Sequence, residues 1–282
     1  MPELPEVETV RTDIAPVLEG ARITEASIYD ARLVRPFAPE IVAAELAGER
    51  VEAVERRGKY LIVRFESGRV LLIHLRMTGS LRHGRSGTLA DDPHRRAVLI
   101  LDNGSDVAYR DVRRFGTWEL LEPEELAGYL AARLGPEPLG RMSATRLGRR
   151  LAGRRAPLKA ALLDQRTLAG LGNIYVDEAL WYARLDPLRP AGGLDQDELR
   201  GLNRGIRKAL RLGIERQGAS LRDYTRPDGE SGAMQDEFRV YGRDGEPCGR
   251  CRAPIAKTRV AGRGTHYCPR CQAATRADSR PT

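Results

Sequence analysis

Cysteine is rare in this 282-residue chain, and long hydrophobic runs are absent. No apolar run approaches the roughly 20 residues of a membrane-spanning helix, and no apolar leader segment follows the N-terminus. The four cysteines all lie between positions 248 and 271, whereas a secreted disulfide framework would distribute them along the chain. We therefore expect a soluble, cytoplasmic protein without a membrane segment, and a metal site in place of disulfides.

Acidic residues are too few to balance the basic ones. The 39 Asp and Glu against 47 Lys and Arg leave a net charge of +8, which suits a polyanionic partner better than a small neutral metabolite. The excess is concentrated between residues 133 and 159, where eight basic residues accompany a single acid, Glu137. A solvated helix face would normally mix both signs, so we favour a nucleic-acid surface for this stretch. Its basic residues are Arg133, Arg141, Arg146, Arg149, Arg150, Arg154, Arg155 and Lys159.

The first half of the chain predicts one helix followed by short strands. Apolar residues recur at helical spacing from Val7 to Leu18, with Pro5 suited to the first turn and Gly20 to the end. A hydrophobic content of 41% over this length allows two domains with their own cores, and we expect the first to be a β-sandwich. The expected strands, separated by turn signals, are residues 60–65, 70–75, 97–101, 107–110 and 117–121.

The second half predicts mainly helices. A helical stretch opens at Glu122 and ends at residues 134–139, whose prolines and glycine mark a domain boundary. Asp195 and Glu198 then form a capping-box pattern at the start of a longer helix, whose apolar stripe we assign to the core. Between these points, helical spacing is found at residues 158–168 and about 174–183.

Three later segments are not helical in pattern. Residues 217–236 lack periodicity and predict a long loop, which is typical of a functional lid or of disorder. Residues 238–241 predict a strand, and we expect the tail from about residue 272 to be mobile.

The cysteines form two pairs with metal-ligand spacing. Cys248 and Cys251 are separated by two residues, as are Cys268 and Cys271, and sixteen residues lie between the pairs. Two such thiolate pairs can close a tetrahedron around one Zn²⁺ and leave no open position, so we expect a structural zinc. A redox dithiol is the alternative, which the presence of two pairs disfavours. The hairpin between the pairs carries three cations that could clamp a phosphate: Lys257, Arg259 and Arg263.

The N-terminus offers a nucleophile. Once Met1 is removed, Pro2 is a secondary amine already in a ring, so that attack on a sugar C1′ would give an iminium directly. Glu3 is the nearest carboxyl for proton transfer. Alternatively, Pro2 and Pro5 only stiffen the start of the helix, and the acids favour its N-terminus.

Other candidate sites lie in turns. The glycine turn before Asn173 could present a helix N-terminus to a phosphate, although such a turn also serves packing. Lys59 lies at a strand entrance. Met77, Arg113 and Phe115 lie near loop tips and are suited to wedge a duplex, although each taken singly is more easily explained as structural.

Taken together, these motifs resemble the formamidopyrimidine-DNA glycosylase family over nearly the whole chain. The matching motifs are Pro-Glu-Leu-Pro-Glu-Val-Glu-Thr at 2–9, Gly-Lys-Tyr-Leu at 58–61, His-Leu-x-Met-x-Gly-Ser-Leu at 74–81, Arg-Arg-Phe-Gly at 113–116, Leu-Gly-Pro-Glu-Pro-Leu at 134–139, Gly-Asn-Ile-Tyr at 172–175 and the four cysteines. The resemblance implies an α+β chain that removes oxidised purines from damaged double-stranded DNA as a monomer and then cleaves the strand as an AP lyase. It implies a β-sandwich domain with flanking helices (1–133), a helix-two-turn-helix domain with a lesion-capping loop (134–236), a zinc finger with one Zn²⁺ (237–272) and a flexible tail (273–282).

The resemblance also implies residue roles. DNA would bind between the domains, with Pro2 as nucleophile and Glu3 as proton shuttle. The residues implied in catalysis are Pro2, Glu3, Glu6, Lys59 and Arg263. Those implied in DNA binding are Met77, His94, Arg113, Phe115, Asn173, Lys257 and Arg263.

One departure and two rivals qualify this hypothesis. Where many members carry His-x-His, this chain has His94-Arg95-Arg96, which puts a role for a second histidine in doubt. A relative that acts on oxidised pyrimidines would usually have glycine where this chain has Leu4. A non-catalytic zinc protein that only binds DNA would not need Pro2, Glu3 and Lys59.

Overall fold

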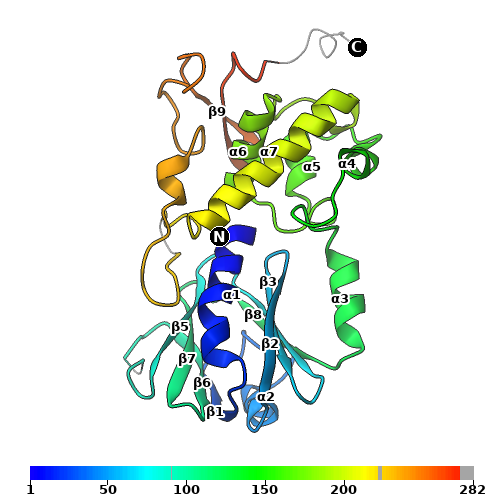
Figure 1. The fold of residues 1–282 in the computed structure, drawn as a ribbon. Helices are drawn as coiled ribbons and strands as arrows, with labels where there is room; N and C mark the ends of the chain where they lie inside the picture. The colour runs from blue at the N-terminus through cyan, green and yellow to red at the C-terminus, as the bar shows by residue number, and fades with distance from the viewer. Residues whose placement is uncertain (90, 222–223, 274–282) are drawn as a thin grey trace. The chain divides into compact units, whose positions relative to one another are not determined.

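The computed structural model describes residues 1–89, 91–221 and 224–273 (Figure 1). The chain forms two compact units, the first made of residues 1–132 and 216–235, the second of residues 133–215 and the chain from 236 onward. None of the helices in the described ranges is long and apolar enough to cross a membrane.

The first unit is a sandwich of two four-stranded antiparallel sheets. Helix α1 (Leu4–Leu18) contacts strands of both sheets, and Figure 1 shows it in blue beside them. Val7 and Ile14 of α1, Phe65 and Tyr109 share one buried core, which confirms the expected sandwich. One sheet has the order β1 (Ile23–Ile28), β6 (Arg95–Leu101), β7 (Ser105–Asp111), β5 (Gly79–Arg85), and the other β2 (Val51–Arg57), β3 (Tyr60–Phe65), β4 (Val70–His74), β8 (Thr117–Leu121). The other helices of this part of the chain are α2 (Pro39–Leu46) and α3 (Glu125–Arg133).

The strands that the sequence did not reveal are β1, β2 and β5. Each of them lies at an edge of its sheet. An edge strand is covered on fewer sides, so it tolerates the charges and glycines that hide a strand pattern. Strand β2, for example, alternates buried Val51 and Val54 with charged residues. Strand β2 therefore has no apolar run that a sequence pattern could reveal.

The second unit combines helices with a two-stranded hairpin. Its long helix begins with the expected capping box, because the Asp195 N–H donates to Glu198 and the Glu198 N–H to Asp195. Gly205 lets this helix approach its neighbour, since a Cβ there would lie only 3.2 Å from Ala183 N. The elements are α4 (Ala144–Leu151), α5 (Leu158–Leu163), α6 (Asn173–Ala183), η1 (Ala191–Gly193), α7 (Gln196–Glu215), η2 (Met234–Glu237), β9 (Ala256–Val260) and β10 (Arg263–Tyr267).

Residues 238–241 do not form the predicted strand. The buried carboxylate of Glu178 in α6 accepts the backbone N–H groups of Arg239, Val240 and Tyr241 at 2.9–3.0 Å, which replaces pairing with another strand. Gln272 does not belong to a mobile tail, because it is fully buried and its Nε2 donates to Leu185 O at 3.0 Å.

The long segment after α7 belongs to the first unit, whereas the sequence placed residues 217–236 in the helical domain. Hydrogen bonds to α1, described below, account for this placement. Of the expected capping loop, residues 222–223 lie outside the described residues, as do residues 274–282 of the expected tail.

Candidate active site and nucleic-acid interface

The N-terminal turn is buried although it begins the chain. Pro2 is buried, and Glu3 and Glu6 are only 3% and 2% exposed. Glu3 is the N-cap of α1, and its N–H donates to Glu6 Oε2 at 2.8 Å. Carboxylates are stabilised at a helix N-terminus, where the backbone N–H groups point outward. The helix start therefore fixes Pro2 and two carboxylates within one turn.

Glu6 also holds the segment that follows α7. Its Oε1 accepts the Ala219 N–H at 2.9 Å, and Tyr224 Oη donates to the Glu6 carbonyl at 3.4 Å. Gly218 has a φ of +82°, and a Cβ there would lie 2.8 Å from Glu6 Cγ, so only glycine fits. Burial, and then the Glu6 charge, raise the pKa of Tyr224, which keeps its hydroxyl protonated. No local pattern in the sequence reveals this clamp, which joins α1 to Gly218, Ala219 and Tyr224.

Lys59 is a buried cation beside a neutral histidine. Lys59 is 5% exposed and follows Gly58 in the turn between β2 and β3. Tyr60 pairs across the sheet with His74, and their rings meet edge to face at 4.6 Å. Burial, and then the charges of Arg76 and Lys59, lower the pKa of His74 to about 3. His74 is therefore an acceptor at neutral pH, and its Nδ1 accepts the Arg76 N–H at 3.0 Å.

The wedge candidates project from neighbouring turns of the same unit. Phe115 is 50% exposed, and the Arg113 guanidinium lies over its ring at 4.9 Å. Met77 is half-buried, just before β5. His94 is half-buried, and its Nδ1 lies 3.4 Å from an Arg96 nitrogen, so an arginine stands beside it where the family pattern has a second histidine.

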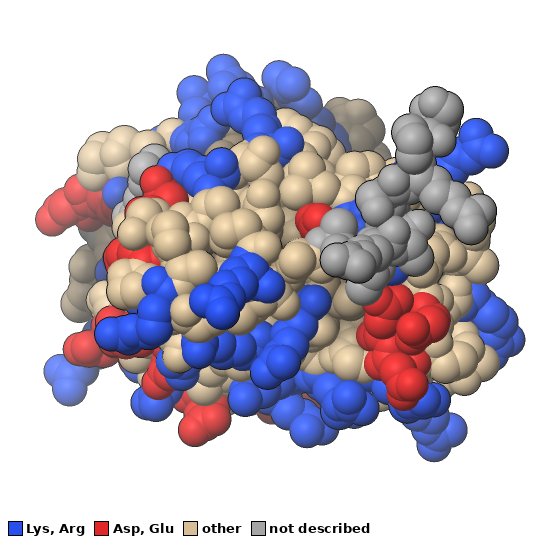
Figure 2. Space-filling model, turned by 90° about the horizontal axis from the view of Figure 1, so that it is seen from above, with Lys and Arg blue, Asp and Glu red and all other residues tan. Residues whose placement is uncertain are grey.

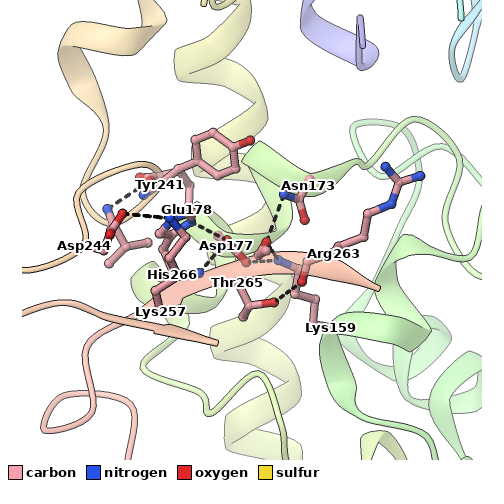
Figure 3. A network of polar contacts seen from close by, with 12 residues as sticks. Lys159, Asn173, Asp177, Glu178, Tyr241, Asp244, Lys257, Arg263, Thr265 and His266 are labelled. Carbon is pink, nitrogen blue, oxygen red and sulfur yellow. Dashed lines mark hydrogen bonds and ion pairs between the residues drawn. The ribbon is translucent and has the colours of Figure 1, made fainter. Parts of the chain in front are cut away.

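Asn173 and the finger hairpin form the second group of candidates, in the second unit. Asn173 begins α6 and its Nδ2 donates to Gly264 O at 3.0 Å, while its buried Oδ1 has no hydrogen-bond partner among the described residues. Arg263 is exposed, and Figure 3 shows its side chain directed away from the buried contacts. Lys257 is exposed and pairs with Asp244 at 3.3 Å. A helix N-terminus thus lies beside a hairpin that presents a cation.

A buried ion pair secures this hairpin to the helices (Figure 3). Lys159 and Asp177 are both 0% exposed as side chains, with Nζ and Oδ1 2.6 Å apart. Lys159 also donates to Gly264 O at 2.9 Å, and Asp177 Oδ2 accepts the His266 N–H at 2.9 Å. Lys159 is therefore not part of the basic surface that the sequence predicted, because its ammonium group is buried and paired with Asp177.

The rest of the basic run includes a solvent-exposed helix face. In α4, Leu147 and Leu151 are buried while Arg146, Arg149 and Arg150 are exposed, and the helix contains no acid. Figure 2 shows Lys and Arg outnumbering Asp and Glu on the face seen from above. Arg154 differs, because it pairs with Asp164 at 3.1 Å.

The four cysteines converge on one point. Their sulfur atoms all lie within 4.8 Å of one another, with Cys251 and Cys268 at 3.4 Å and Cys248 and Cys271 at 4.0 Å. Four thiolates around Zn²⁺ at ~2.3 Å would be separated by similar distances. The set fits one structural Zn²⁺, and the closed tetrahedron leaves no position for a substrate.

Three known protein families match most of this chain. The family "Formamidopyrimidine-DNA glycosylase N-terminal domain" matches residues 1–118, the "Formamidopyrimidine-DNA glycosylase H2TH domain" residues 134–225, and the "Zinc finger found in FPG and IleRS" residues 245–274. Formamidopyrimidine-DNA glycosylase of Chloroflexus aurantiacus is 44% identical over 262 residues, covering 93% of this chain and 94% of the relative. That of Cereibacter sphaeroides is 47% identical over 257 residues, covering 88% and 90%.

Solved structures agree. A Lactococcus lactis FPG variant in complex with Fapy-dG-containing DNA is 37% identical, with a TM-score of 0.91 over 97% of this chain and 100% of that one. MutM (FPG) protein from Thermus thermophilus is 41% identical, with a TM-score of 0.86 over 97% and 100%. By sequence, by domain content and by fold, the chain belongs to the formamidopyrimidine-DNA glycosylase family.

Proposed function

We propose that this protein excises oxidised purines from double-stranded DNA through Pro2 and then cleaves the strand. The observation that carries the proposal is the buried N-terminal turn, in which Pro2 lies next to Glu3 and the Glu6 clamp. An N-terminal proline needs no such burial to begin a helix. A nucleophile does need a fixed position and a nearby carboxyl.

The chemistry follows from a secondary amine at C1′. After removal of Met1, the Pro2 nitrogen attacks C1′, the bond from C1′ to the base breaks, and the base leaves with a proton. The sugar ring opens and an iminium forms between Pro2 and C1′. Loss of a C2′ proton then expels the 3′ phosphate, and a second elimination expels the 5′ phosphate. Glu3 moves the protons in this scheme, and Lys59 supplies a buried positive charge for the lesion and its phosphate.

The remaining sites hold the DNA. Asn173, Lys257 and Arg263 take phosphates at a helix N-terminus and a cationic hairpin, and Arg263 also supports the reacting strand. Met77, Arg113 and Phe115 fill the gap left by a flipped nucleotide, with His94 as a neighbouring contact. Flipping a nucleotide out of the duplex costs a few kcal/mol, and the cost is lowest for a damaged base. This difference in flipping cost contributes to the selectivity for the lesion. We further propose that the protein acts as a monomer, in the cytoplasm and on chromosomal DNA.

Borohydride trapping tests the nucleophile. A duplex with a single 8-oxoguanine should give a covalent adduct with the wild-type protein and a strongly reduced adduct with Pro2→Gly. Pro5→Ala, which changes the next proline of the same turn, is the matched control and should retain the adduct. Absence of a wild-type adduct, or an equal adduct from Pro2→Gly, would refute the role of Pro2.

Two further measurements separate the rivals. Mass spectrometry of the purified N-terminus should show that Met1 is gone, because a retained Met1 would block Pro2. Cleavage of duplexes with 8-oxoguanine, formamidopyrimidine or thymine glycol should favour the purine lesions. A preference for thymine glycol would indicate the pyrimidine-specific alternative, and binding without cleavage would indicate a non-catalytic protein.

A further inference from the structure

Strand β7 ends in a buried carboxylate that binds two separate turns. Asp111 is 1% exposed. Its Oδ2 accepts the N–H groups of Phe115 at 2.9 Å and Gly116 at 2.8 Å. Its Oδ1 accepts the Arg113 N–H at 3.2 Å and the hydroxyl of Thr78. One side chain therefore satisfies three backbone donors of the turn 112–116 and one side-chain donor next to Met77.

Thr78 joins the two turns directly. Its Oγ1 accepts the Arg113 N–H at 3.0 Å while its hydroxyl hydrogen is donated to Asp111. Because Thr78 follows Met77 in the chain, the backbone that carries Met77 is tied to the turn that carries Arg113. The wedge residues thus share one anchor, although they lie more than thirty positions apart in sequence.

Packing also restricts this turn. A Cβ at Gly116 would collide with Tyr109 Oη and would lie 3.1 Å from Asp111 Oδ2. Arg114 has a φ of +59°, and its guanidinium pairs with the buried Asp30 at 2.9 Å. By contrast, Phe115 is half exposed and contacts the exposed Arg113, and such a solvent-exposed pair contributes little to the placement of either side chain. The backbone bonds to Asp111 therefore set where these side chains point.

We propose that Asp111 is a positioning residue that holds Met77, Arg113 and Phe115 in register for insertion into the duplex. This inference rests on the proposed function, because it assigns a purpose to an anchor of the wedge. Hydrogen bonds to a carboxylate are stronger than those between neutral groups, so one buried acid can fix a turn that solvent would otherwise loosen. Asp111 itself touches no DNA in this scheme.

Asp111→Asn tests the proposal. The amide keeps the volume but offers one acceptor oxygen, and its NH₂ group faces N–H donors that it cannot accept. If Asp111→Asn weakens one charge-assisted hydrogen bond that positions the wedge, the rate of excision from a duplex containing 8-oxoguanine should fall by roughly tenfold to a hundredfold. Lyase activity on a single-stranded abasic oligonucleotide should stay at the wild-type level, because no duplex has to be wedged open.

Asp106 provides the matched control. It lies in the same strand, is 5% exposed, and anchors a different turn by accepting from Ser86 Oγ at 2.6 Å and the Gly87 N–H at 2.7 Å. Asp106→Asn should leave the ratio of duplex to single-strand activity unchanged. Thr78→Val keeps the shape and removes only the hydroxyl, so it should lower the same ratio as Asp111→Asn, by less.

The two activities separate the possible failures. Equal loss of both activities in Asp111→Asn and Thr78→Val would show that Asp111 only maintains the fold, and wild-type duplex activity in both would show that the wedge does not depend on it. Either result overturns the positioning role. A wild-type protein that is inactive on both substrates would instead refute the proposed function, and with it the wedge.

Discussion

Replacing Lys159 by methionine should destabilise the second unit selectively. Methionine has a similar length but removes the charge and the donor. It would leave the Asp177 carboxylate buried without the Lys159 cation. Gly264 O would lose the Lys159 donor and keep the Asn173 donor. Asp177 would keep the His266 N–H at 2.9 Å, which compensates only part of the lost interaction.

The expected loss is large. Removing one member of a buried ion pair costs about 3–5 kcal/mol, out of a domain stability of about 5–15 kcal/mol. The surviving bond from His266 favours the lower end, about 3 kcal/mol. The double variant Lys159→Met/Asp177→Asn removes both charges and keeps an acceptor for the His266 N–H. Its loss should be smaller than that of the single variant by about 1–2 kcal/mol.

Tryptophan fluorescence can report each unit separately. The chain has two tryptophans, Trp118 in the first unit and Trp181 in the second. In a Trp118→Phe background with zinc present, urea unfolding followed through Trp181 gives the free energy of unfolding of the second unit. Arg200→Met, which breaks the exposed pair between Arg200 and Asp197 on α7, is the control and should change it by under about 1 kcal/mol.

Two results would refute this reasoning. A loss below about 1 kcal/mol for Lys159→Met would mean that the pair behaves like an exposed one. A double variant no more stable than the single variant would mean that the buried Asp177 charge is not what makes the single change costly.

Three further predictions concern other parts of the molecule. Because the pKa of His74 is about 3 in the folded protein and 6.5 in the unfolded one, the unfolded state takes up the proton first. Lowering the pH from 7 to 5 should therefore cost the first unit about 2 kcal/mol through this residue, measured by Trp118 fluorescence in a Trp181→Phe background, and His74→Asn should lose this component. Removing zinc with a chelator should change Trp181 fluorescence, because Trp181 packs against Cys248 and Cys268, and should weaken binding to undamaged DNA in a filter assay. Arg146, Arg149 and Arg150 of α4 should be replaced together by alanine. The slope of log affinity against log salt concentration should then fall by the amount that corresponds to up to about three phosphate contacts. Lyase activity on single-stranded abasic DNA should not change.

Local patterns sufficed for much of the fold. The cysteine spacing predicted the metal site, the apolar spacing predicted α1, α6 and α7, and the turn signals predicted β3 and β8 closely. The edge strands β1, β2 and β5 were missed because polar, charged or glycine residues interrupt their apolar pattern. The grouping of the loop after α7 with the first unit depends on a bond between Glu6 and Ala219, 213 residues apart, which no local pattern reveals.

The partners of buried polar side chains could not be predicted from the sequence. Lys159 counted as one more cation in a basic run, although it is fully buried against Asp177. Nothing in the local sequence around Glu178 shows that it receives the backbone of residues 239–241, more than sixty positions away. Charge and periodicity indicate how a residue is solvated on average, but a partner distant in sequence decides whether that residue can be buried.

In several of these contacts a buried carboxylate accepts backbone N–H groups of a loop. A loop lacks a strand ladder, so its N–H groups need other acceptors, and a carboxylate can accept several at once. Glu6 binds the N–H groups of Glu3 and Ala219, Asp111 those of the wedge turn, and Glu178 those of the backbone leading to the zinc finger.

Each of these acids also lies close in sequence to a residue proposed to act on DNA. Glu6 follows Pro2 by four positions, Asp111 precedes Arg113 by two, and Glu178 follows Asn173 by five. A change from carboxylate to amide at any of them keeps the volume but halves the acceptor oxygens, so its first effect should be to loosen a loop, not to open the core. Such variants should therefore lose activity on duplex lesions before they lose stability, whereas apolar core variants should lose stability first.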